Sequence, residues 1–151
     1  MNVYALDSNI VSFYLKGKAT VIDNIEKAIS EDYAIVIAPI AYYEVKRGLL
    51  LINATKQLKK LESLCDLFPV GELGGYLMED AIRIYVQERK AQRNTEDADI
   101  FIAAFCLHND YILVTDNITL IPQKISVDDC FRSKSSLKVK MLMEFGVSTH
   151  I

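Results

Sequence analysis

The chain has 151 residues, of which 51% are apolar and 25% are charged, so it is long enough to bury the core of one ordinary soluble domain. Its formal net charge of −3 argues against a protein that coats nucleic acid through overall positive charge, although a local basic patch is compatible with it. The three cysteines are widely spaced, which argues against a zinc site and a disulfide framework and favours a reducing cytoplasm. The sequence shows no signal-peptide pattern and no apolar run of about 18 residues, which argues against a membrane span.

The first half of the chain is predicted to alternate short strands with helices. In chain order we expect a strand at 3–6, a helix to about 16, a helix at 19–31, a strand at 33–38, and helices at 39–51 and 55–65. Both strands are continuous apolar runs, which is typical of strands buried on both faces. Ser8 or Asn9 can cap the first helix, and Pro39 suits the first turn of the third.

The second half continues this alternation and then changes character. In chain order we expect a short edge strand at 67–70, helices at 76–93 and 95–108, a strand at 111–115 and a short strand at 125–127. Strands alternating with helices imply parallel βαβ units. The sequence therefore predicts an α/β fold, a three-layer α/β/α sandwich with a mainly parallel central sheet.

The predicted domain covers residues 1–131, and the last residues, 132–151, form a tail of different composition. The tail begins polar and Ser-rich and becomes amphipathic. This pattern is compatible with a terminal strand, a terminal helix, a partner-binding arm or a partly disordered segment.

Acidic residues follow the predicted strands at the same end. Asp7 and Asp116 come directly after strands, and Glu44 lies one turn into the helix after the second strand. Because the carboxyl ends of parallel strands meet at one edge of a sheet, these groups are expected to converge on one crevice. Asp97 and Asp99 join them if the helix that they open starts at the same edge.

Each acid also has a purely structural interpretation. Asp7 suits a helix cap, Asp116 a turn, and Asp97 the first turn of a helix, where the macrodipole favours an acid. Glu44 is compatible with an ion pair one turn along its helix, but it shares a stripe with apolar residues, where a carboxylate needs a partner. Asp99 lies deeper in its helix and is harder to explain as a cap.

Taken together, the acids indicate a site for a divalent cation. Carboxylates gathered within a few ångströms repel one another and raise their pKa values, and a bound cation removes that penalty. Ligands that are all oxygen select a hard ion such as Mg²⁺ or Mn²⁺. Such an ion lowers the pKa of water and neutralises charge on a phosphodiester.

The acids belong to four longer segments: LDSN at 6–9, YEVKRG at 43–48, DADIFIAA at 97–104 and LVTDN at 113–117. In their order and spacing over about residues 2–130, these segments together resemble the PIN-domain ribonucleases, especially the VapC-type toxins of toxin–antitoxin modules. The resemblance implies a PIN-like parallel sheet flanked by helices, an endoribonuclease site that depends on Mg²⁺ or Mn²⁺, a homodimer and an antitoxin partner.

Carried over residue by residue, the resemblance implies that Asp7, Glu44 and Asp99 are catalytic acids. Asp116 is the fourth, although many PIN sequences carry this acid one position later, where the present chain has Asn117. The metal ligands implied are Asp7, Asp99 and Asp116. Supporting roles around the acids are expected for Ser8, Asp97, Thr115 and Asn117.

The expected reaction is hydrolysis of RNA phosphodiester bonds, in the family usually of tRNA or ribosomal RNA. An acidic site repels RNA, so cations must lie beside it. The candidates are Lys46, Arg47, Arg89 and Arg93. Alternatives are a catalytically silent PIN-like interaction module and another Mg²⁺-dependent phosphohydrolase. The haloacid-dehalogenase pattern, however, requires a second acid where this chain has Asn9.

The antitoxin is expected to bind apolar residues that look exposed on the early helices. These are Ile10, Phe13, Tyr14, Leu49, Leu50 and Ile52. For Ile10 and Leu49 a place in the core is an equally good interpretation, because helical spacing alone does not distinguish a core face from a binding face.

Overall fold

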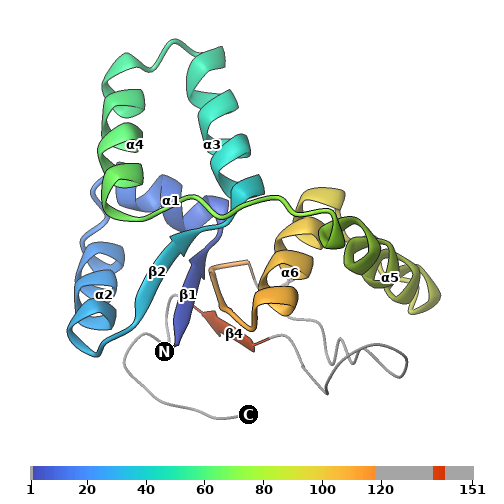
Figure 1. The fold of residues 1–151 in the computed structure, drawn as a ribbon. Coiled ribbons are helices and arrows are strands. Elements are labelled where there is room, and N and C mark those ends of the chain that lie inside the picture. Colours follow the sequence, from blue (N-terminus) through green and yellow to red (C-terminus); the bar gives the residue numbers. More distant parts are fainter. Residues whose placement is uncertain (1, 118–137, 142–151) are drawn as a thin grey trace.

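The computed structural model describes residues 2–117 and 138–141, and its strands form one four-stranded parallel sheet (Figure 1). In chain order the strands are β1 (Val3–Leu6), β2 (Ala34–Ile37), β3 (Ile112–Thr115) and β4 (Lys138–Met141). Their order across the sheet is β2-β1-β3-β4, and every neighbouring pair is parallel. The predicted α/β class with a parallel sheet is confirmed.

The described helices flank this sheet. They are α1 (Ser8–Leu15), α2 (Ala19–Ser30), α3 (Pro39–Leu51), α4 (Thr55–Leu67), α5 (Tyr76–Lys90) and α6 (Asp97–Asn109). None of them combines the length and apolar character needed to cross a membrane. Pro39 occupies the first turn of α3, as predicted, because its missing N–H has no partner there in any case.

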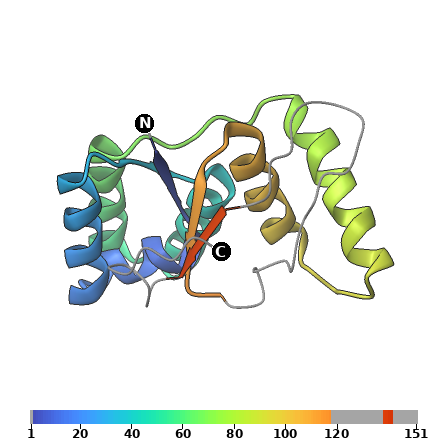
Figure 2. The ribbon, with the colours of Figure 1, turned by 90° about the horizontal axis from the view of Figure 1, so that it is seen from below.

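Alternate residues of the strands enter two separate cores, one on each face of the sheet. Tyr4 and Leu6 belong to the core that α1, α2 and α4 cover, whereas Ala5 between them belongs to the core that α5 and α6 cover. This alternation follows from the two-residue period of a strand. Helices therefore lie on both sides of the strands (Figure 2), which confirms the predicted three-layer sandwich.

The strands end level with one another, and this edge of the sheet positions the acidic residues. Leu6 pairs with Ile37 of β2 and with Val114 of β3, so the carboxyl ends of the three strands coincide. The first turns of α1, α3 and α6 lie at this edge (Figure 1). The chain thus brings segments separated by about a hundred positions to one place, as the open parallel sheet requires.

Two helix boundaries differ from the prediction at the same connection. The helix expected at 76–93 ends at Lys90, and the helix expected at 95–108 begins at Asp97. Between them Gln92 adopts a left-handed conformation with φ of 59°, and the Arg93 N–H returns to the Glu88 carbonyl at 2.9 Å. These bonds end α5 early, which the local sequence pattern does not reveal.

The tail contributes to the sheet. Residues 138–141 form β4, which pairs with β3, so part of the predicted tail of 132–151 is a strand, one of the forms that the sequence left open. The strand expected at 67–70 is reduced to a single bridge between Ile37 and Val70. The strand expected at 125–127 and the rest of the tail lie outside the described residues.

Some apolar residues expected at the surface lie inside. Ile10 is fully buried in the core beneath α1, so of the two interpretations open for it the place in the core is the one observed. Phe13, Tyr14 and Leu49 are partly buried and pack against the same core. The exposed members of the set are Leu50 and Ile52, at the end of α3.

Candidate active site

Asp7 is a buried carboxylate at the end of β1, and hydrogen bonds hold both of its oxygens. The residue is 3% exposed. Its Oδ1 accepts the backbone N–H of Ser8 at 2.7 Å, and its Oδ2 accepts the hydroxyl of Thr115 at 2.6 Å. Asp7, rather than Ser8 or Asn9, is the N-cap residue of α1. The structural and functional interpretations of Asp7 are therefore compatible, since the cap fixes a carboxylate at the strand edge.

Ser8 connects Asp7 to Glu44. The Ser8 Oγ donates to the Glu44 Oε1 at 2.7 Å and also lies 3.3 Å from the Asp7 Oδ1. A hydroxyl has only one proton to donate, so the shorter contact, with Glu44, receives it. A single small side chain thus holds carboxylates from β1 and α3 on either side of it.

The half-buried Asp99 in the first turn of α6 lies in the electrostatic field of these two acids. Burial raises its pKa from 3.8 to about 6, and the negative charges of Asp7, Glu44 and Glu96 add to the rise. Burial likewise raises the pKa of Asp7, with a contribution from Glu44, against hydrogen bonds from Thr115 and Ser8 that lower it. The charge of Glu44 therefore reaches both Asp7 and Asp99, and the charge of Asp7 reaches Asp99.

Asp97 and Asp116 lie at the margin of this group. Asp97 is exposed, and Asp116 is half-buried one residue beyond β3. The charge of Glu44 raises the pKa of Asp7, and the charges of Asp7, Glu44 and Glu96 raise the pKa of Asp99. In the described part of the chain, neither Asp97 nor Asp116 is among these causes. Their roles as ligand and supporting residue stay predictions.

Thr115 and Asn117 contribute through hydrogen bonds. Thr115 is fully buried and donates to Asp7, while its Oγ1 accepts the backbone N–H of Asn117 at 3.0 Å. The hydroxyl therefore joins the end of β3 to the end of β1. The interaction with Asn117 comes from its backbone, so it requires no particular side chain at that position.

The sequence analysis did not single out Glu96. It occupies the N-cap position of α6 and its charge acts on Asp99. The signal was present in the sequence as a run of three acids within EDAD, but the first two of these acids are each explained by the helix macrodipole.

The donor set suits a hard divalent cation. The three interacting side chains offer only carboxylate oxygens, and a cation between them would relieve their repulsion. Among the described residues, no three Asp, Glu, His or Cys side chains stand close enough together to form a finished metal site. Glu44 and Asp99 are half-exposed, so rotation about their side-chain bonds is open to them.

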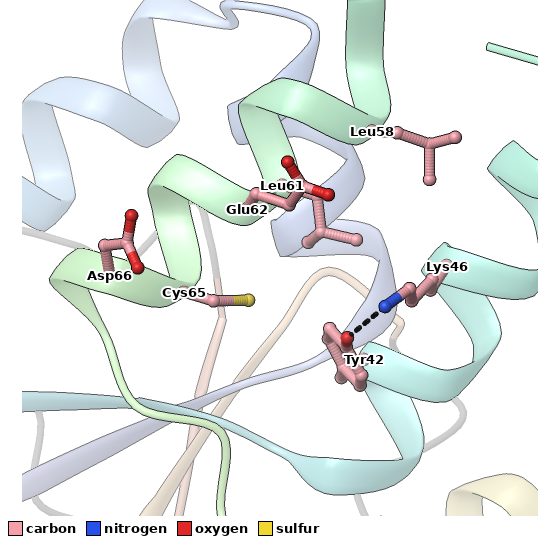
Figure 3. Close-up of a pocket in the computed structure, with 7 residues that line it drawn as sticks. All are labelled: Tyr42, Lys46, Leu58, Leu61, Glu62, Cys65 and Asp66. Carbon is pink, nitrogen blue, oxygen red and sulfur yellow. Dashed lines mark hydrogen bonds between the residues drawn. The ribbon is translucent and has the colours of Figure 1, made fainter. Parts of the chain in front are cut away.

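Two of the predicted RNA-binding cations lie on α3. Lys46 donates to the Tyr42 hydroxyl at 2.7 Å and lines a cavity of about 210 Å³ between α3 and α4 (Figure 3). It is two residues from Glu44, about 200° around the helix axis, so the two side chains leave α3 on nearly opposite sides. Arg47 is exposed and stacks on Tyr43, 4.8 Å from the ring centroid.

The other two predicted cations, Arg89 and Arg93, are bound within the connection between α5 and α6. Arg93 forms a two-pronged ion pair with Glu88, whose carboxylate is buried. Arg89 donates to the Arg93 carbonyl at 3.1 Å and stacks on Tyr85. RNA binding by either residue stays a prediction, since both already have structural partners.

Solved structures of toxin–antitoxin proteins share this fold. VapBC2 from Rickettsia felis bound to a promoter DNA fragment matches with a TM-score of 0.78 and 16% identity, over 92% of this chain and 98% of that one. DNA-bound VapBC from Salmonella typhimurium matches with a TM-score of 0.76 and 15% identity, over 94% and 99%. The chain shares its fold with chains of these VapBC structures.

A more distant example supports the same conclusion. VapBC-5 from Mycobacterium tuberculosis, a member of the VapBC family of toxin–antitoxin systems, matches with a TM-score of 0.62 and 14% identity, over 93% of this chain and 98% of that one. No protein-family model and no curated protein matches the sequence. The similarity to VapBC structures is therefore a similarity of fold. This is the fold that the four sequence segments led us to expect.

Proposed function

We propose that this chain is a metal-dependent endoribonuclease and the toxin of a toxin–antitoxin pair. The observation that carries the proposal is the group of Asp7, Glu44 and Asp99 at the carboxyl edge of the sheet. Burial is the main cause of the raised pKa values of Asp7 and Asp99, and the negative charges of neighbouring acids add to it. Carboxylates of this kind are costly to a fold unless a cation joins them. The VapBC fold of the chain agrees with this assignment.

In the proposed site Asp7 and Asp99 hold Mg²⁺ or Mn²⁺, with Asp116 as a further ligand and Glu44 bound directly or through water. When bound, the ion lowers the pKa of water and neutralises charge on the phosphodiester. The chain's own contribution is orientation. Thr115 fixes the Oδ2 of Asp7, and Ser8 fixes the Oε1 of Glu44, which leaves the Oε2 of Glu44 for a water molecule.

RNA reaches this acidic edge through flanking cations. Arg47 is exposed on α3, the helix that also carries Glu44, and its guanidinium lies on the Tyr43 ring. An arginine resting on an aromatic ring can bind a phosphate while the ring stacks on a base. We propose RNA, with tRNA or ribosomal RNA as the expected class, as the substrate, and products with a 5′-phosphate and a 3′-hydroxyl.

The test compares two neighbouring acids on α6. We expect Asp99→Asn to lower Mg²⁺-dependent cleavage of tRNA or ribosomal RNA by about 100-fold or more, because it removes a ligand and a charge. Asp97→Asn makes the same chemical change at an exposed position two residues away and should retain most of the activity. Gel analysis of the RNA, with and without EDTA, measures both. A fully active Asp99→Asn protein would contradict the proposed site.

We also propose that the antitoxin binds the hairpin of α3 and α4. At the end of α3, Leu50, Leu51 and Ile52 are exposed by 54%, 83% and 71%. Beside them a cavity of about 230 Å³ opens between α1, α3 and α4, with Leu15, Val45 and Leu49 in its lining. Its lining also includes Gln57, whose Oε1 is buried without a hydrogen-bond partner. An amphipathic helix with an apolar anchor and a donor for Gln57 suits this surface.

We propose that a second copy of the chain covers the outer face of α5. An apolar stripe of Met78, Ile82, Tyr85 and Val86 is exposed there, about 100° around the helix axis from the buried stripe of Leu77, Ala81 and Ile84. The first turn of α5 carries Glu79 and the last turn carries basic residues. Two such helices packed antiparallel place the acidic end of each beside the basic end of the other, so the face is complementary to itself.

A further inference from the structure

Glu88 is a buried carboxylate that the proposed mechanism does not use. It lies near the end of α5 and is 4% exposed. Its Oε1 accepts the Arg93 Nη2 at 2.6 Å, and its Oε2 accepts the Arg93 Nε at 3.0 Å and the Thr95 hydroxyl at 2.5 Å. These charge-assisted bonds hold the pKa of Glu88 below its ordinary value, with the bond from Arg93 as the largest cause.

The groups that Glu88 holds belong to the connection between α5 and α6. The Arg93 N–H also bonds to the Glu88 carbonyl at 2.9 Å. From the adjacent position on α5, Arg89 donates to the Arg93 carbonyl and to the Asn94 Oδ1. Glu88 and Arg89, which are neighbours on α5 and carry opposite charges, therefore bind residues 93–95 of the connection.

The connection leads directly into the acidic end of α6. Thr95 is followed by Glu96, whose carbonyl accepts the N–H of Ile100 to form the first turn of the helix. Asp99 lies in that turn, and its charge interacts with Asp7 and Glu44. Any change in where the connection meets α6 moves Asp99 relative to Asp7, which β1 and Thr115 hold independently.

We propose that Glu88 is a positioning residue for the acidic site. By binding Arg93 and Thr95 it fixes the start of α6, and so it sets the place of Asp99 beside Asp7 and Glu44. The inference rests on the proposed function, because it takes these acids to be metal ligands. Groups behind metal ligands commonly alter metal affinity without touching the ion.

The test measures Mn²⁺ binding by titration calorimetry, without RNA and without turnover. We expect Glu88→Gln, which keeps the size of the side chain and removes the ion pair with Arg93, to raise the dissociation constant for Mn²⁺ by about tenfold. Glu26→Gln makes the same change at an exposed position on α2 and should bind Mn²⁺ like the wild type. Hydrogen exchange in the metal-free protein should be faster at residues 93–100 in Glu88→Gln and unchanged in β1.

A second pair of variants changes the contacts of Glu88 less than Glu88→Gln does, so the test remains possible if Glu88→Gln fails to fold. Thr95→Val removes the hydroxyl that bonds to Glu88 and keeps the shape of the side chain, and Thr95→Ser keeps the hydroxyl. Weaker Mn²⁺ binding in Thr95→Val, with recovery in Thr95→Ser, supports the inference. Faster exchange in Glu88→Gln together with wild-type Mn²⁺ affinity overturns it, because Glu88 would then serve stability alone. A wild-type protein that binds no Mn²⁺ contradicts the proposed function itself, and the inference with it.

Discussion

Asp7 combines two tasks that a single residue rarely performs at once. As the cap of α1 it satisfies a backbone N–H, and as a buried carboxylate it brings a charge to the strand edge. The cost of burying that charge is reduced by the Thr115 and Ser8 bonds and increased by Glu44. The site is therefore strained electrostatically before any ion binds, although each oxygen of Asp7 accepts a hydrogen bond.

The pKa of Asp99 predicts how the stability of the metal-free protein depends on pH. Its folded-state value of about 6 lies above the ordinary 3.8, so the folded protein holds this proton more tightly than the unfolded chain. The resulting stability is present at low pH and is lost as the pH rises through about 6. Between pH 5 and pH 7, we therefore expect the melting temperature of the metal-free wild type to fall.

Two comparisons isolate the role of Asp99 in that pH dependence. Asp99→Asn should melt at a higher temperature than the wild type at pH 7 and should depend less on pH, because it carries no charge to repel Asp7 and Glu44. Saturating Mg²⁺ or Mn²⁺ should raise the melting temperature of the wild type at pH 7, since the ion binds only the folded state. Calorimetric melts that show the same pH slope in both proteins would contradict the assignment of the shift to Asp99.

At the scale of single residues, the sequence shows which residues have the right chemistry for a site better than it shows how each side chain is buried and paired. That Asp7, Glu44 and Asp99 gather at one edge of the sheet could be predicted, because each stands at a fixed offset from a strand or an apolar helix, and their roles in a reaction stay predictions. Glu88 could not, because it resembles any charged residue of a solvated helix until Arg93 folds back on it. For Ile10 the sequence left a core position and a surface position equally open, because its helix is apolar on several sides and spacing does not reveal which side faces the sheet.

At the scale of elements, strands buried on both faces and helices with a clear apolar stripe were predictable. The end of α5 and the start of α6 were not, because side chains from α5 rather than local propensity decide where the connection lies. β4 was equally difficult, since Lys138–Met141 alternates basic and apolar residues and gains its place only by pairing with β3. Long-range pairing is the information that a local pattern lacks.

The α3 and α4 hairpin gives a prediction about the antitoxin. Leu51→Glu should weaken binding of the cognate antitoxin by about tenfold or more while leaving RNA cleavage unchanged, because an 83% exposed side chain contributes to binding and not to the core. Leu67→Glu is the matched control, a 67% exposed leucine at the far end of α4. Titration calorimetry of both variants with the antitoxin measures the difference. Equal loss in the two, or none in either, would exclude the end of α3 as the binding surface.

Phe13 is less useful for this purpose than the sequence suggested. It packs against the core beneath α1, and the Lys18 ammonium lies 4.1 Å from its ring centroid. A charge at this position would disturb folding as well as any interface, so its effect on antitoxin binding would be ambiguous. Exposed residues of the α3 and α4 hairpin separate an effect on antitoxin binding from an effect on folding.

At the scale of the molecule, the two helical layers differ in what they leave exposed. The layer of α1, α2 and α4 encloses a core of large aliphatic side chains. Beside it, the consecutive residues Leu50, Leu51 and Ile52 are exposed at the end of α3, whereas Ile29 on α2 and Leu67 on α4 are exposed singly. On the other side α5 packs against α6 (Figure 1), and Met78, Ile82, Tyr85 and Val86 form an exposed apolar stripe on α5. The proposed antitoxin surface at the end of α3 and the proposed contact between copies on α5 therefore use different helices.

The outer face of α5 gives the last prediction, on the oligomeric state. Ile82 is 49% exposed in the middle of the stripe, so in an antiparallel pair of α5 helices it lies near the symmetry axis, close to its own copy. Ile82→Glu therefore places two like charges together in an apolar contact and should convert a dimer to a monomer. Ile29→Glu on α2 makes the same change at a residue that is 48% exposed and should leave the dimer intact. Sedimentation velocity at micromolar concentrations distinguishes these states, and a wild-type protein that stays monomeric there, or an Ile82→Glu dimer, would rule out this face as the interface between copies.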